Sequence, residues 1–153
     1  MKFRMLLSAL LLAAGVVFVA GCGEKGDSNK AKETEKPNPQ AQTPQGKAAA
    51  AFWDAMFVKC DVEAAKGMMV EGDFKKNVHQ WIEQFQNNKK QADYAEYANM
   101  IAKAKIGNVT VNGDTAKVSM VFVNEGEPRE VKDSVVLKQV GDKWLVESFK
   151  VDL

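Results

Sequence analysis

Residues 106–122 read IGNVTVNGDTAKVSMVF, and this stretch decides the fold class. In its second half, every other residue is small or apolar, which is the period-two pattern of a strand with one buried face. The preceding Asn112-Gly113-Asp114 accommodates positive φ angles at low cost, as tight hairpins require. We therefore expect an antiparallel pair, with a first strand over residues 106–111 and a second whose core face carries Ala116, Val118, Met120 and Phe122.

Two further turn signals follow this hairpin toward the C-terminus. The first is Asn124-Glu125-Gly126-Glu127, and the second is Gly141-Asp142. Between them the alternation continues, and residues 143–151 form a last strand. The C-terminal half therefore predicts a four-stranded antiparallel meander, in which the third strand buries Val131, Val135 and Leu137.

Helical spacing replaces this alternation on the N-terminal side. A first helix is expected over residues 47–59, and its apolar stripe extends to Cys60, which predicts a buried thiol. Asp61 is suited to cap a short second helix that ends at Gly72, and Asp73 is suited to cap a third. The third helix stops at residues 87–90, and a fourth covers residues 91–102. The four stripes are Ala49, Phe52, Trp53 and Met56; Val62, Ala65 and Met69; Phe74, Val78, Trp81, Ile82 and Phe85; and Tyr94, Tyr97, Ala98 and Ile101.

Helices followed by strands indicate an α+β fold, with the N-terminal helices packed on one face of a curved four-stranded antiparallel sheet. Three stretches resemble small bacterial lipoproteins of the nuclear-transport-factor-two-like superfamily: AAAAFW at 48–53, VKCDVEAA at 58–65 and GDKWLV at 141–146. The resemblance implies a cystatin-like cone with a cavity. It implies little about function, because the superfamily includes isomerases, dehydratases, ligand binders and interaction domains.

The N-terminus has the pattern of an export signal. Two basic residues precede an apolar run that is shorter than the roughly 20 residues of a membrane-spanning helix. The run ends in Val19-Ala20-Gly21-Cys22, which resembles the lipobox of bacterial lipoproteins, whose cysteine is acylated with palmitate-type chains. We expect a cleaved signal peptide over residues 1–21 and lipidation at Cys22, with an uncleaved anchor as the alternative. Residues 22–46 lack large apolar side chains and are expected to form a disordered tether, which leaves residues 47–153 as the α+β domain.

The net charge of the mature chain limits the kinds of partner that are expected, and the residue after Cys22 bears on its location. Removal of residues 1–21 takes away Lys2 and Arg4, so the 21 Lys and Arg fall to 19 against 20 Asp and Glu. A near-neutral chain offers no basic patch for nucleic acid, and membrane attachment depends on the acyl chains. Gly23 stands where Asp commonly marks inner-membrane retention. The expected location is the exported side of the cell envelope, on the outer membrane if the host has one.

Asp133 is the first candidate for chemistry. It shares strand parity with Val135 and Leu137, which aims its carboxylate toward the concave apolar face. A carboxyl buried there would have a raised pKa suited to general acid or base work. The alternative is a solvated position at the rim, or pairing with Lys132 or Arg129.

Tyr94 and Tyr97 on the fourth helix, and His79 beside the stripe of the third, are the candidate partners of Asp133. Each also has a structural reading: the tyrosines pack in the core, and the histidine flanks its helix. The sequence shows no cluster of metal ligands, no phosphate-binding loop and no serine nucleophile motif, so no metal or cofactor is implied.

These observations predict a non-catalytic envelope module that binds a small apolar ligand, a peptide or an envelope protein. The alternative is an isomerase or dehydratase in which Asp133 acts with Tyr94, Tyr97 or His79. A third reading is an interaction module that uses a face or edge of the sheet.

Overall fold

The computed structural model describes residues 38–124 and 127–151. The predicted signal peptide, Cys22, the tether as far as residue 37 and the centre of the turn at 125–126 lie outside the described residues. In the described part, no helix combines the length and the apolar character needed to cross a membrane.

The strands form one antiparallel sheet in chain order, as the sequence predicts. Gly113 and Gly141 have φ angles of 61° and 63°, so the first and the last of the three predicted turns use the backbone freedom of glycine. The strands are β1 (Lys105–Asn112), β2 (Thr115–Asn124), β3 (Glu127–Val140) and β4 (Lys143–Lys150).

One face of the sheet is buried. The predicted inward residues of β2 are at most 3% exposed, and so are Val135 and Leu137 on β3. The side chain of Val131 lies outside the description. The pairing register shifts once between each two neighbouring strands, and such bulges bend and twist a sheet. The sheet is therefore curved, as predicted.

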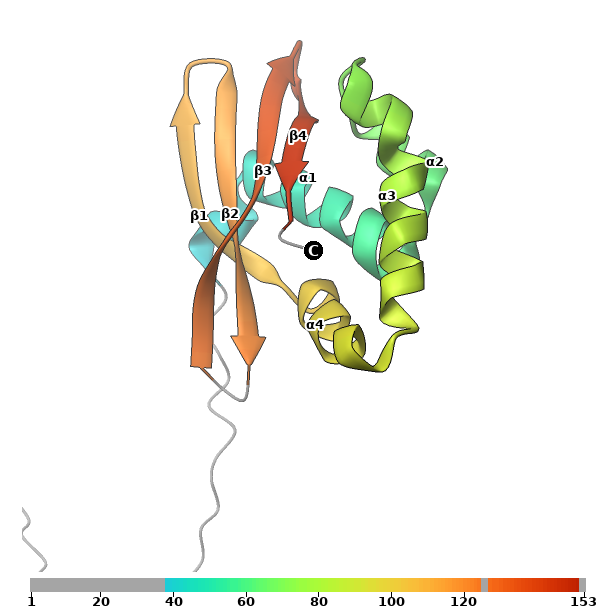
Figure 1. Cartoon of the computed structure of the whole chain (residues 1–153). Coiled ribbons are helices and arrows are strands. Elements are labelled where there is room, and N and C mark those ends of the chain that lie inside the picture. Colours follow the sequence, from blue (N-terminus) through green and yellow to red (C-terminus); the bar gives the residue numbers. More distant parts are fainter. Residues whose placement is uncertain (1–37, 125–126, 152–153) are drawn as a thin grey trace, which may run out of the picture. The chain divides into compact units, whose positions relative to one another are not determined.

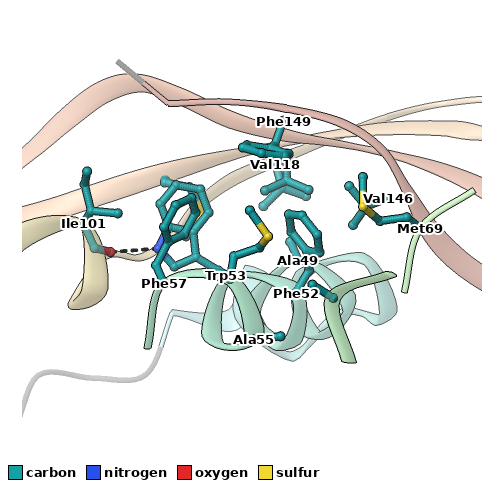
Figure 2. Close-up of a cluster of buried hydrophobic side chains, with 14 of the residues drawn as sticks. Ala49, Phe52, Trp53, Ala55, Phe57, Met69, Ile101, Val118, Val146 and Phe149 are labelled. Carbon is teal, nitrogen blue, oxygen red and sulfur yellow. Dashed lines mark hydrogen bonds between the residues drawn. The ribbon is translucent and has the colours of Figure 1, made fainter. Parts of the chain in front are cut away.

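The helices gather on one face of this sheet (Figure 1), which confirms the predicted α+β architecture. Trp53 donates an indole hydrogen bond of 2.8 Å to the Ile101 carbonyl, so the first and last helices are tied together in the interior (Figure 2). The elements are η1 (Pro39–Gln42), α1 (Pro44–Trp53), η2 (Asp54–Lys59), α2 (Val62–Gly67), α3 (Asp73–Lys89) and α4 (Ala92–Ala102).

The folded part begins before the predicted boundary at residue 47. The side chain of Asn38 donates to the carbonyls of Ile106 and Gly107, both at 2.8 Å, and Thr43 caps α1 by accepting from the Gly46 amide at 3.0 Å. Residues 38–46 thus belong to the folded unit. The sequence composition did not predict this, because hydrogen bonds of polar side chains fix the segment and it contains no large apolar residue.

The first helix changes its hydrogen-bonding register near its end. Its last six residues, η2, form a π-helix, in which each bond spans one residue more than in an α-helix. Cys60 is the C-cap of this helix and packs against the edge of the core. Cys60 adopts a left-handed conformation with φ 53° and is half-buried, so it is less buried than predicted. An ion pair of 2.6 Å joins Lys59 to Asp54, and the hydrogen bond with Asp54 raises the pKa of Lys59.

The connection from α2 to α3 also differs from the prediction. Asp61 caps α2 as expected, accepting from the Ala64 amide at 3.0 Å, but the helix ends at Gly67. Gly72 is the N-cap of α3, and Asp73 is its first helical residue. The segment between the helices is extended because it pairs in parallel with Val146 on β4. α3 continues to Lys89, through most of the predicted interruption.

Phe149 joins the helices to the sheet at the centre of the core. Its ring lies 5.5 Å from Phe52, 5.8 Å from Phe74, 5.7 Å from Trp81 and 6.3 Å from Phe57, measured between centroids. Tilted and edge-on contacts of this kind are the favoured geometries of aromatic pairs. The predicted stripes of α1 and α3 meet β4 at this ring.

Candidate functional site

Asp133 is buried, with 1% of its surface exposed. It lies on β3 where the register with β2 shifts, because Ser119 pairs with Ser134 and Val121 pairs with Glu130. The β3 residues between Glu130 and Ser134, which include Asp133, therefore lie opposite Met120, an inward residue of β2. The carboxyl group therefore lies inside the folded unit and not in solvent.

Tyr97 lies on the same side of the sheet as Asp133. Its side chain is half-buried, and its ring meets Phe122 edge-on with 6.2 Å between centroids. Phe122 is the inward residue of β2 that follows Met120. Asp133 and Tyr97 therefore both lie on the core side of the sheet.

The structure does not bring the other two candidates to this place. His79 is exposed on α3, next to the buried Val78. Tyr94 is 43% exposed in the first turn of α4, before the buried residues Ala98 and Ile101. Both therefore face solvent. Among the described residues, no three His, Cys, Asp or Glu side chains are grouped closely enough to hold a metal ion.

A cleft of about 430 Å³ opens on another side of the folded unit, between α1, the end of α2 and β4. Small residues on one face of α1 and the missing side chain of Gly67 leave the space, while Met68 and the half-buried Trp144 supply large apolar surfaces. Asp142 and Lys143 bring charge to it. The lining residues are Pro44, Ala48, Ala51, Gly67, Met68, Asp142, Lys143, Trp144 and Leu145.

Sequence reasoning did not find this cleft. Its walls come from segments that are nearly 100 residues apart, and they meet because α1 packs on β4 and Met69 pairs in parallel with Val146. Two signals were present in the sequence: the alanines at 48 and 51, one helical turn apart, and the tryptophan two residues after the last turn. A face of small residues next to an aromatic strand is compatible with either close packing or a cleft.

No protein-family model matches the sequence, and no curated protein does either. Among solved structures, the chain is similar to a variant named Rd1NTF2_05, with 14% identity and a TM-score of 0.43 over 68% of this chain and 92% of that one. It is also similar to a Campylobacter jejuni protein provisionally described as an NTF2-like transpeptidase, with 18% identity and a TM-score of 0.45 over 69% of this chain and 98% of that one.

Proposed function

We propose that this chain is a lipid-anchored binding protein of the cell envelope, and that its ligand occupies the cleft between α1, α2 and β4. The observation that carries the proposal is the cleft itself. Its volume of about 430 Å³ falls within the range of roughly 300–1,000 Å³ that is typical of small-ligand sites. Such sites combine an apolar lining with a few polar groups, as this one does.

The lining indicates what the ligand offers. Trp144 and Met68 suit an apolar group, because an indole face and a thioether both adapt to flat or aliphatic partners. Burial of about 100 Å² of apolar ligand surface would contribute about 2.5 kcal/mol. Lys143 and Asp142 at the cleft suit a polar or charged end.

The anchor is supported by the sequence alone, through the Val19-Ala20-Gly21-Cys22 pattern. We expect Cys22→Ser to release the protein from membranes or to block its processing, because no acyl chain can then be attached. Membrane fractionation and detergent-phase partitioning measure this. Cys60→Ser is the matched control and should remain in the membrane fraction. Retention of Cys22→Ser at mature size would contradict lipidation.

The burial of Asp133 favours one alternative, an isomerase or dehydratase in which Asp133 is the base and Tyr97 its partner. The compound recovered from the native protein would then be converted on incubation with fresh protein, as mass spectrometry can follow. Asp133→Asn should abolish conversion while binding persists. Conversion at an unchanged rate in Asp133→Asn would exclude this mechanism.

A further inference from the structure

β4 is an edge strand, and its outer edge is only partly covered. The sheet order ends with β4, so one side of this strand has no neighbouring strand among those described. The segment after α2 covers part of that side: the Val146 amide donates to the Met68 carbonyl at 2.8 Å, and the Val70 amide donates to the Val146 carbonyl at 2.9 Å. The edge of β4 thus already binds one short extended segment.

The same edge is open at Trp144. Backbone groups alternate in direction along a strand, so Trp144 points its N–H and C=O to the same side as Val146. The partner strand agrees, because Gln139 lies opposite Trp144 and sends its own amide to the Asp114 carbonyl at 2.7 Å, away from β4. Among the described residues, no backbone group pairs with Trp144 on the outer side. Its donor and acceptor point away from β3, and Trp144 is one of the residues that line the cleft.

We propose that the ligand of the cleft is an extended peptide that adds to the edge of β4 at Trp144. This inference rests on the proposed function and gives the ligand its chemical class. A peptide that runs antiparallel to β4 would place one residue opposite Trp144, and this residue would accept from the Trp144 amide and donate to the Trp144 carbonyl. Such edge addition gives affinity through main-chain bonds and specificity through alternate side chains.

The cleft also selects the peptide side chains. A residue aligned with Trp144 places its side chain on the face of the sheet that α1 covers, where Ala48 and Ala51 leave room for an apolar group. Its two neighbours in the peptide point to the other face, the side of Lys143. Lys143 forms no ion pair within the described residues. The peptide that fits therefore has an apolar residue flanked by an acidic one.

The test uses the mature chain with Cys22→Ser and a library of capped linear heptapeptides. The tightest binder is resynthesised with one backbone N-methyl group at each position in turn. We expect one position, the residue aligned with Trp144, to lose affinity by about tenfold or more, because a hydrogen bond is lost and the methyl group blocks the edge. The positions on either side should change by less than about threefold, since their amides point away from β4.

Hydrogen exchange gives a second readout on the protein. The Trp144 amide should become protected in the complex, whereas the Leu145 amide, which points toward β3, should not change. Equal tolerance of N-methylation along the peptide would overturn edge addition. A library without binders, together with a small molecule retained in the cleft, would overturn the peptide but leave the proposed function standing. If the cleft retained neither a peptide nor a small molecule, the peptide proposal and the proposed function would both be wrong.

Discussion

Asn38 shows how one side chain can complete a strand that is irregular by itself. The register of β1 and β2 shifts between Ile106 and Val109, which leaves backbone groups of β1 without a partner in the sheet. Asn38 donates to the carbonyls of Ile106 and Gly107, and the Gln40 side chain accepts from the Val109 amide at 3.0 Å. These polar groups therefore bind to side chains that precede the first helix.

Asn38→Ala should lower the free energy of unfolding by about 1–3 kcal/mol, because it removes these bonds at a partly buried site. Urea denaturation measures the change. Gln42→Ala, at an exposed position of the same turn, is the control and should change stability by less than about 0.5 kcal/mol. Equal stability of the two variants would show that the Asn38 bonds contribute nothing.

Asp133 illustrates what a residue pattern can and cannot predict. Strand parity with Val135 and Leu137 correctly predicted the inward direction, and the structure buries the carboxyl group. Tyr97 also lies toward the core, as its helical spacing predicted. Tyr94 and His79 are exposed, because one lies in the first turn of its helix and the other lies beside the stripe. Periodicity assigns a face, but it does not say how far a neighbouring element extends over that face.

At the scale of elements, two helical glycines have opposite surroundings. Gly46 is buried in the first turn of α1, and a Cβ there would meet the Gln40 carbonyl oxygen and lie 2.9 Å from the Ala41 Cα. Gly67 ends α2, and a Cβ there would meet nothing within 4 Å. η1 can therefore pack on α1 only because residue 46 has no side chain.

We expect Gly46→Ala to destabilise the protein by about 1–3 kcal/mol, because η1 must move away from α1. Gly67→Ala should stabilise it by up to about 1 kcal/mol, since alanine favours the helix and has open space. Thermal or urea unfolding of the two variants measures how the same substitution, glycine to alanine, changes stability in the two surroundings. Effects of the same sign would contradict the packing described here.

The strands and most helices could be predicted because their information is local. Alternation in β2, glycine at two turns and the Asp61 cap each lie within a few residues. The N-terminal boundary and the end of α2 could not be predicted in this way. The N-terminal boundary depends on hydrogen bonds from Asn38 to Ile106 and Gly107, which are 68 and 69 positions away in the sequence. The end of α2 depends on pairing with Val146.

In the whole molecule, a predicted lipid anchor precedes in sequence a folded unit that presents the cleft between α1, α2 and β4. The cleft forms only when α1, the end of α2 and the last hairpin meet, so it depends on the complete fold. Ala51 lines it and Ala50 does not, although both are exposed on the same helix. Ala51→Phe should therefore block the cleft, whereas Ala50→Phe adds the same side chain to the helix surface and leaves the cleft open.

Native mass spectrometry can show directly whether this cleft holds a ligand. The mature protein and its Ala51→Phe and Ala50→Phe variants are extracted from their own envelope and weighed intact. We predict a discrete mass excess, beyond the lipid, in the unaltered protein and in Ala50→Phe, and its loss in Ala51→Phe, because the new ring fills the cleft. The same mass excess in all three proteins, or none in any, would contradict ligand binding in this cleft.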